Sequence, residues 1–203
     1  MRPEYEKRHN GDRQTVTRVL EGDFTAFETL VEKYQGRLFR HLRKMVGDNQ
    51  QAEDLLQETF LSAYRGLKGF TGNSSLSTWL FKIATNNALM FLRKHRPELI
   101  EYADEIKVDL DYPFLTASPE FADSPLEILL SREGREQIEQ AIEALPLIYR
   151  TVIVLRDVEG FSLQEVSEIT DASITAVKSR LHRARSAVRE ALASYYMEKD
   201  LSS

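Results

Sequence analysis

The sequence contains no cysteine, no long apolar run and no glycine-rich phosphate loop. Without cysteine there can be no disulfide, no thiolate metal site and no thiol redox sensor. The four histidines are scattered without the spacing of metal ligands, and no nucleophile elbow occurs. We therefore expect no metal ion, no cofactor and no enzymatic activity. No segment approaches the length of a membrane span, so membrane insertion is not expected.

The first residues, MRPEYEKRHNGDRQ, have no apolar core, so a signal peptide is not expected. Together with the lack of cysteine, this favours a cytoplasmic location. Strand-like alternation of apolar and polar residues is scarce, whereas helical spacing recurs. The 203 residues are enough for one or two domains. We predict an all-α fold of two small helical domains joined by a flexible linker.

The first domain is predicted over 12–97, where three amphipathic stripes follow one another. The first stripe stops at Gly47, the second ends between Gly66 and Gly72, and the third ends at Pro97. Their apolar members are Phe27, Leu30, Val31, Tyr34, Leu38, Leu42 and Met45; then Leu56, Phe60, Tyr64 and Leu67; then Leu76, Leu80, Ile83, Ala84 and Phe91.

A linker is predicted over 98–125. From Glu98 to Glu127 the chain holds nine acidic residues against one base, Lys107, together with three prolines and no sustained periodicity. A second domain is predicted over 126–197. It includes the apolar segment LIYRTVIVL after Pro146, for which we favour a buried helix, although its β-branched residues leave a strand open.

The second domain contains a predicted helix-turn-helix. Ser162 and Glu165 have the spacing of a capping box, and Thr170–Ser173 interrupts the helix that follows. The next helix has an apolar stripe formed by Val177, Leu181, Ala184 and Val188. Between Lys178 and Arg189 it carries five basic residues and no acid. This one-sided charge favours entry into a DNA major groove over a simple solvated helix, although the net charge of the whole chain is −5.

A second basic helix is predicted over 76–96. Its geometry directs Asn86 outward, where an amide can contact a base edge, and Asn87 toward the core, where it forms a structural hydrogen bond. Trp79 either stacks on a base or packs at the edge of the core; both interpretations stay open. The preceding polar loop, 68–75, either holds an extruded base or simply connects two helices.

Three stretches resemble the extracytoplasmic-function (ECF) type of bacterial sigma factor. They are AEDLLQETFLSAYRGLKGF (52–70), SSLSTWLFKIATNNALMFLRKHRP (74–97) and the segment 145–190 with VKSRLHRAR. The resemblance implies region 2 over the first domain, with polymerase-clamp binding and minus-ten recognition and melting. It implies region 4 over the second domain, with minus-thirty-five recognition. Asp171 departs from the family pattern, which usually has glycine at this turn, but aspartate tolerates a left-handed backbone. Ile174 departs from the family pattern as well, because it is apolar where the family often has a polar residue.

The resemblance also implies three sets of site residues. The set expected to bind the polymerase, here termed the clamp surface, is Asp54, Gln57, Glu58 and Leu61. The set expected to hold melted minus-ten DNA, the strand surface, is Phe70, Asn73, Ser74, Trp79, Lys82, Asn86 and Arg93. The set expected to bind upstream duplex, the groove surface, is Lys178, Ser179, Arg180, His182, Arg183 and Arg185, with Arg180 and Arg185 on phosphates.

The sequence therefore predicts an alternative sigma factor that binds core RNA polymerase and promoter DNA, both as upstream duplex and as a single strand. Family members are usually held inactive by an anti-sigma protein, so such a partner is expected too. The alternative is an autonomous helix-turn-helix regulator that binds duplex operators without polymerase. A simple acidic helix face would explain the charges of the clamp surface equally well.

Overall fold

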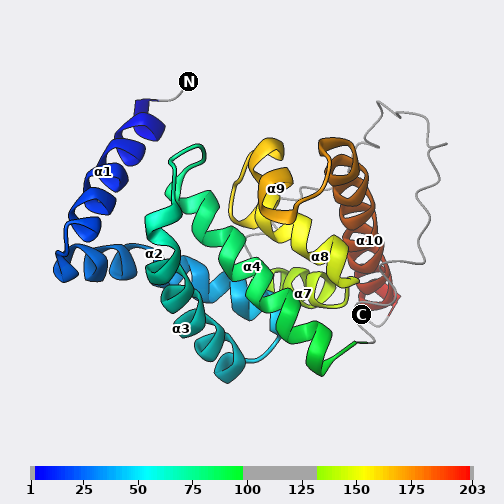
Figure 1. Cartoon of the computed structure of the whole chain (residues 1–203). Coiled ribbons are helices and arrows are strands. Elements are labelled where there is room, and N and C mark those ends of the chain that lie inside the picture. Colours follow the sequence, from blue (N-terminus) through cyan, green and yellow to red (C-terminus); the bar gives the residue numbers. More distant parts are fainter. Residues whose placement is uncertain (1–2, 98–131, 202–203) are drawn as a thin grey trace.

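The computed structural model describes residues 3–97 and 132–201, and every regular element in these two ranges is helical (Figure 1). The helices are α1 (Pro3–Leu20), α2 (Phe24–Val46), α3 (Asn49–Gly66), η1 (Leu67–Gly69), α4 (Leu76–His95), α7 (Arg132–Glu143), α8 (Leu147–Ile153), η2 (Val154–Val158), α9 (Leu163–Thr170) and α10 (Ile174–Leu201). The all-α prediction is confirmed for these residues. The predicted linker 98–125 and the start of the second domain lie outside them. Within the described ranges, no helix is both long enough and apolar enough for a membrane span.

Side-chain caps explain where several helices begin. The Asp23 carboxylate accepts hydrogen bonds from the backbone N–H groups of Thr25 and Ala26, and the Ser75 hydroxyl accepts one from Thr78. Such caps satisfy amide donors that have no partner inside the helix. The predicted capping box at Ser162 is present in both directions. At the end of α2, Gly47 takes the left-handed conformation expected of a helix terminator.

Helices α1–α4 form the N-terminal unit, in which α2 packs against α1, α3 and α4. The first predicted stripe is confirmed most clearly in its C-terminal half, where Leu38, Leu42 and Met45 are fully buried. Helix α1 is not among the predicted elements. Its buried residues include Val16 and Val19, which is too short an apolar pattern to stand out in the sequence.

The predicted apolar stripe of α3 is wrong by about one position along the helix, although its last member, Leu67, is buried as predicted. Apart from Leu55, the residues that face the core are small, because Ala52, Thr59 and Ala63 are buried and allow a close approach to the neighbouring helices. Phe60 and Tyr64 lie at the flank instead, where both rings contact Phe27.

Helices α7–α10 form the C-terminal unit, in which α8 and α10 pack closely. The segment LIYRTVIVL is helical, as predicted, and its last part continues into the π-helix η2. There the backbone N–H of Glu159 donates to the carbonyl of Val154, five residues earlier, at 2.9 Å. The wide turn inserts one extra residue before Gly160, whose φ of +79° redirects the chain.

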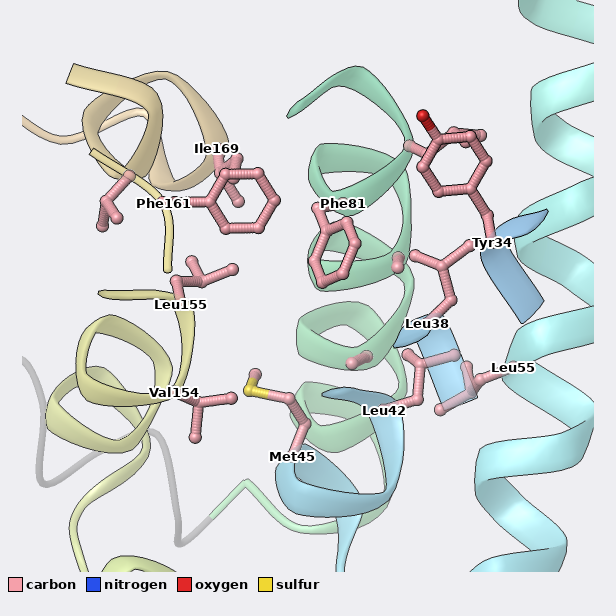
Figure 2. Close-up of a cluster of buried hydrophobic side chains, with 14 of the residues drawn as sticks. Tyr34, Leu38, Leu42, Met45, Leu55, Phe81, Val154, Leu155, Phe161 and Ile169 are labelled. Atoms are coloured by element: carbon pink, nitrogen blue, oxygen red, sulfur yellow. The ribbon is translucent and has the colours of Figure 1, made fainter. Parts of the chain in front are cut away.

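The two units pack against each other, and α4 lies between the rest of the N-terminal unit and α9 (Figure 1). The sequence pattern placed one buried side on α4, but the structure buries a second side. Phe81 is fully buried and meets the ring of Phe161 edge to face, with centroids 4.8 Å apart. Figure 2 shows Phe161, Leu155 and Val154 facing Phe81 and Met45 across the junction. Burying each phenylalanine contributes about 1.5–3 kcal/mol relative to leaving it exposed.

Two arginines fix this junction. Arg37 of α2 lies over the rings of Phe81 and Phe161, at 5.1 and 5.7 Å, and its Nε donates to the Glu159 carboxylate at 3.1 Å. Arg150, which is only 8% exposed, donates to the carbonyl of Met45 at the end of α2, and to those of Glu143 and Leu145. Burial lowers the pKa of Arg150, and these carbonyls compensate for the lost hydration.

The ion pairs across the junction share one polarity. In the described residues, four ion pairs join the units, and in each the cation belongs to the N-terminal unit and the anion to the C-terminal unit. They are Arg37–Glu159, Arg43–Glu143, Lys44–Glu139 and Lys82–Asp171. The junction is thus electrostatically complementary as well as apolar.

Replacing Arg150 with methionine tests this description of the junction. Methionine keeps the apolar stem but leaves buried carbonyls without their donor, so Arg150→Met is expected to lower the free energy of unfolding by about 2–3 kcal/mol. The exposed Arg65→Met is the matched control and should change it by less than about 0.5 kcal/mol. Urea unfolding followed by circular dichroism measures both. Equal stability of the two variants would contradict a structural role for Arg150.

Candidate nucleic-acid interface

The strand surface is formed by the loop after η1 and the outward side of α4. Asn73, Asn86 and Arg93 are exposed, whereas Phe70, Ser74, Trp79 and Lys82 are half-buried. The Ser75 cap fixes the start of α4, and Gly72, at a φ of +73°, turns the loop toward it. The structure therefore brings the predicted loop and helix residues together on one side of the N-terminal unit.

Trp79 is packed rather than free. The centroid of its ring lies 5.3 Å from that of Phe70. Its six-membered ring also covers Gly66 of α3, where a Cβ added to the glycine would lie 3.4 Å from Trp79 Cζ2. The side chain belongs to the edge of the core. Of the two interpretations from the sequence, core-edge packing describes this arrangement, and the half-exposed part of the ring still faces the loop.

Asn86 and Asn87 point in different directions, as the helical geometry predicts. Asn86 is exposed, while the Nδ2 group of Asn87 donates to the hydroxyl of Thr59 on α3 at 3.3 Å. Thr59 in turn donates to the carbonyl of Leu55. Asn87 therefore helps to join α3 and α4, and Asn86 is free to contact a ligand.

The C-terminal unit reaches the strand surface through α9. Lys82 Nζ lies 2.5 Å from the Asp171 carboxylate, and the hydroxyl of Thr78 donates to Glu165 at 3.1 Å. A cavity of about 380 Å³ lies along this contact. It is lined by Asn73, Ser74, Thr78, Trp79, Lys82, Glu168 and Asp171. Nothing local in the sequence indicated that acidic side chains of α9 would meet the strand surface.

The groove surface lies on α10. Lys178, His182 and Arg185 are exposed at intervals of four and three residues and therefore share one side of the helix. The opposite stripe is buried as predicted, with Val177 and Ala184 inaccessible to solvent.

Ser179, Arg180 and Arg183 are less open than the sequence indicated, and Arg185, although exposed, is paired within the chain. Arg183 and Ser179 are half-buried, and Arg183 lies within 3.4 Å of the Tyr149 hydroxyl. Arg180 is half-buried too, and burial lowers its pKa. Arg185 donates both its Nε and Nη2 groups to the Asp157 carboxylate, at 2.9 and 2.7 Å, and these hydrogen bonds raise its pKa.

The clamp surface is open to solvent on α3, where Asp54, Gln57, Glu58 and Leu61 are all exposed. Leu61 is 51% exposed although it is apolar. Beyond it, Tyr64 stacks on Phe24, which is 67% exposed, with ring centroids 6.0 Å apart. An acidic row continued by exposed apolar rings suits a protein partner better than a nucleic acid.

No group of histidine, aspartate and glutamate side chains in the described ranges is arranged to hold a metal ion. The residues that sequence reasoning missed are those that join the units. One of them left a local signal, because Arg150 is a charged residue inside an apolar segment and so required a buried partner.

Comparison with known protein families gives matches to both units. Residues 30–98 match the model of sigma-70 region 2, and residues 135–188 match that of sigma-70 region 4. The RNA polymerase sigma-H factor of Pseudomonas aeruginosa is 37% identical over 185 residues, which span 89% of this chain and 93% of the relative. The ECF RNA polymerase sigma factor SigW of Bacillus subtilis is 35% identical over 182 residues, 89% of this chain and 96% of the relative.

The chain belongs to the ECF family of RNA polymerase sigma factors. This confirms the resemblance found in the sequence. Region 2 corresponds to α2–α4 and region 4 to the C-terminal unit.

Two solved structures of other sigma factors have a similar fold. CnrH, in complex with the cytosolic domain of CnrY, aligns with a TM-score of 0.64 at 23% identity and covers 91% of this chain and 98% of that chain. The sigma factor RpoE of Bartonella quintana, in complex with the anti-sigma factor NepR, aligns with a TM-score of 0.60 at 24% identity and covers 82% of this chain and 96% of that chain. These likenesses establish the fold.

The turn of the helix-turn-helix in this sigma factor provides a test. Asp171 has a φ of +50° and is the one non-glycine residue with a positive φ in the described ranges. Asp171→Gly suits this backbone and should stay within about 1 kcal/mol of the parent in the free energy of unfolding. Asp171→Val should lose about 1–2 kcal/mol, because its β-carbon disfavours the left-handed region. Both variants lack the ion pair to Lys82, so the difference between them in urea unfolding isolates the backbone effect. Equal stabilities would contradict it.

Proposed function

We propose that this sigma factor binds core RNA polymerase and directs it to specific promoters. In this proposal the clamp surface binds the polymerase, the groove surface binds upstream duplex near minus thirty-five, and the strand surface holds the melted minus-ten strand. The protein acts in the cytoplasm and performs no chemistry of its own, since bond formation belongs to the polymerase. The observation that carries the proposal is the presence, in one chain, of region 2 and region 4 matches.

The arrangement of the exposed side chains supports a division of labour. Lys178, His182 and Arg185 offer cations and donors on one helix side, the kind of surface that contacts phosphates and base edges in a major groove. Asn86 and Arg93 offer the same chemistry on α4. The clamp surface lies on a third helix, α3, so polymerase and DNA need not compete for one site.

Strand capture has a definable energetic requirement. Extruding a base from the duplex costs a few kcal/mol, and stacking returns about 1–3 kcal/mol for each base. The half-buried Trp79 and Phe70, whose rings lie 5.3 Å apart, offer apolar edges beside the polar Asn73 and Ser74. We propose this loop as the place where an unstacked base is held.

We also propose that an anti-sigma protein controls this chain. The support is that RpoE of Bartonella quintana, which shares its fold, is seen with the anti-sigma factor NepR.

Dependence on the polymerase is the first test. Run-off transcription over a promoter library with core polymerase should yield products only when this chain is present, and one selected promoter should shift in a gel only with chain and core together. A chain that shifts duplex promoter equally well without core is instead an autonomous helix-turn-helix regulator, and the proposal fails.

The adjacent amides give the second test. Asn86→Ala should reduce open-complex formation at the selected promoter by about tenfold, because one amide contact to a base contributes about 1–3 kcal/mol. Its urea unfolding midpoint should not change, since Asn86 is exposed. Asn87→Ala is the matched control with the opposite pattern, because losing the bond to Thr59 lowers stability. Permanganate footprinting and urea unfolding separate the two effects. Wild-type strand opening by Asn86→Ala would exclude Asn86 from the site.

A further inference from the structure

We infer that Arg13 of α1 binds a phosphate of the melted minus-ten strand, beside the loop that precedes α4. The inference rests on the proposed function of the strand surface and extends that surface to a second helix. Helix α1 lies outside residues 30–98, which match region 2, and outside the three stretches that carry the family motifs. The ligand is the phosphodiester backbone of single-stranded DNA, not a base.

The buried side of α1 sets the position of Arg13. Asp12 is only 8% exposed, and its carboxylate accepts a hydrogen bond from the hydroxyl of Tyr34 on α2 at 2.7 Å. Val16 and Val19 continue this buried side at spacings of four and three residues. Arg13 follows Asp12 by about 100° around the helix, and it is exposed. Packing of α1 on α2 therefore holds Arg13 at a defined place on the surface.

The guanidinium of Arg13 lies against the loop. Its Nη2 group is 3.5 Å from the carbonyl oxygen of Gly72, and a Cβ added to Gly72 would lie 4.0 Å from both Nε and Nη2. Asn73 and Ser74, the next two loop residues and members of the strand surface, line a cavity of about 310 Å³ together with Arg13. A phosphate next to a base held by this loop is therefore within reach of the guanidinium.

The charge of Arg13 is not taken up by a neighbouring carboxylate. Glu165 and Glu168 line the same cavity, but neither forms an ion pair with Arg13 in the part of the chain that the structure describes. The Glu165 carboxylate instead accepts hydrogen bonds from the backbone N–H and hydroxyl of Ser162 and from the hydroxyl of Thr78. A positive charge therefore remains available beside the loop.

A phosphate suits this position better than the present acceptor does. The hydrogen bond to the Gly72 carbonyl is long, whereas a phosphate offers a charged acceptor that can take two parallel N–H donors from one guanidinium. The cations of the strand surface, Lys82 and Arg93, both belong to α4. Arg13 supplies the corresponding charge at the loop, where the strand surface otherwise offers amide, hydroxyl and aromatic groups. Such a contact positions the strand without reading its sequence.

Salt dependence gives the first experiment. The Arg13→Gln protein is assembled with core polymerase, and Kd is measured by fluorescence anisotropy on a selected-promoter template whose minus-ten non-template strand is single-stranded. Kd should rise about two- to fivefold at about 100 mM NaCl, as expected for the loss of one exposed ion pair. The slope of log Kd against log [NaCl] should fall by about 0.7, the contribution of one phosphate on a single strand.

Arg18→Gln is the matched control. It removes the same charge from the same helix, but the Nε and Nη2 groups of Arg18 donate to the Asp23 carboxylate, at 3.0 and 2.6 Å. Its Kd and salt slope should match those of the parent. The urea unfolding midpoint of Arg13→Gln should match the parent too, because the replaced side chain is exposed.

The second experiment locates the phosphate. A neutral methylphosphonate replaces each linkage of the single-stranded minus-ten segment in turn. At one linkage the replacement should weaken binding of the parent and of Arg18→Gln by about two- to fivefold, but leave Arg13→Gln unchanged, because that protein has already lost the contact. Arg13→Lys keeps the charge, so it should retain most of the salt slope while binding less tightly than the parent, since an ammonium lacks the paired donors.

An Arg13→Gln protein with the parental Kd and salt slope overturns the inference. So does a loss of affinity with an unchanged slope and no linkage specific to Arg13, because that result indicates a base contact or a structural effect. A parental holoenzyme that binds the minus-ten strand no better than a scrambled strand refutes the proposed function, and the inference falls with it.

Discussion

Burial of α4 from two sides is the constraint on which the rest of the structure depends. One side packs on α2 and α3, and the other meets α9 and the segment around Phe161. Phe81 is the residue that makes the second side apolar, and it is fully buried. The first turns of α4 are held by polar contacts on this second side as well, because Thr78 donates to Glu165 and Lys82 to Asp171.

The helices other than α1 were predictable because they depend on local signals. The capping box at Ser162, the end of the first stripe at Gly47, the left-handed turn at Asp171 and the stripe of α10 are set by residues close in sequence, and the structure confirms each of them. Family membership was predictable for a similar reason, since the motifs lie in continuous stretches. The opposite directions of Asn86 and Asn87 follow from helical rotation alone.

The junction was not predictable, because its partners are far apart in sequence and each looks ordinary alone. Arg37 and Glu159 are separated by 122 residues, and in the sequence each is one charged residue of a helix. The error on α3 has another cause: periodicity assigns large apolar residues to the core, whereas small ones at Ala52 and Ala63 allow closer packing there. Partial burial of Arg183 depends on Tyr149, which no pattern within α10 reveals.

The π-helix η2 connects two otherwise separate interactions. Asp157 lies in its last turn and Glu159 follows its end, and the two residues engage different helices. Asp157 receives both donors of Arg185 on α10, and Glu159 receives Arg37 of α2. Arg185 of region 4 and Arg37 of region 2 are thus tied to neighbouring positions at the end of the same turn. One irregular turn thus carries ion pairs both to its own unit and to the opposite half of the molecule.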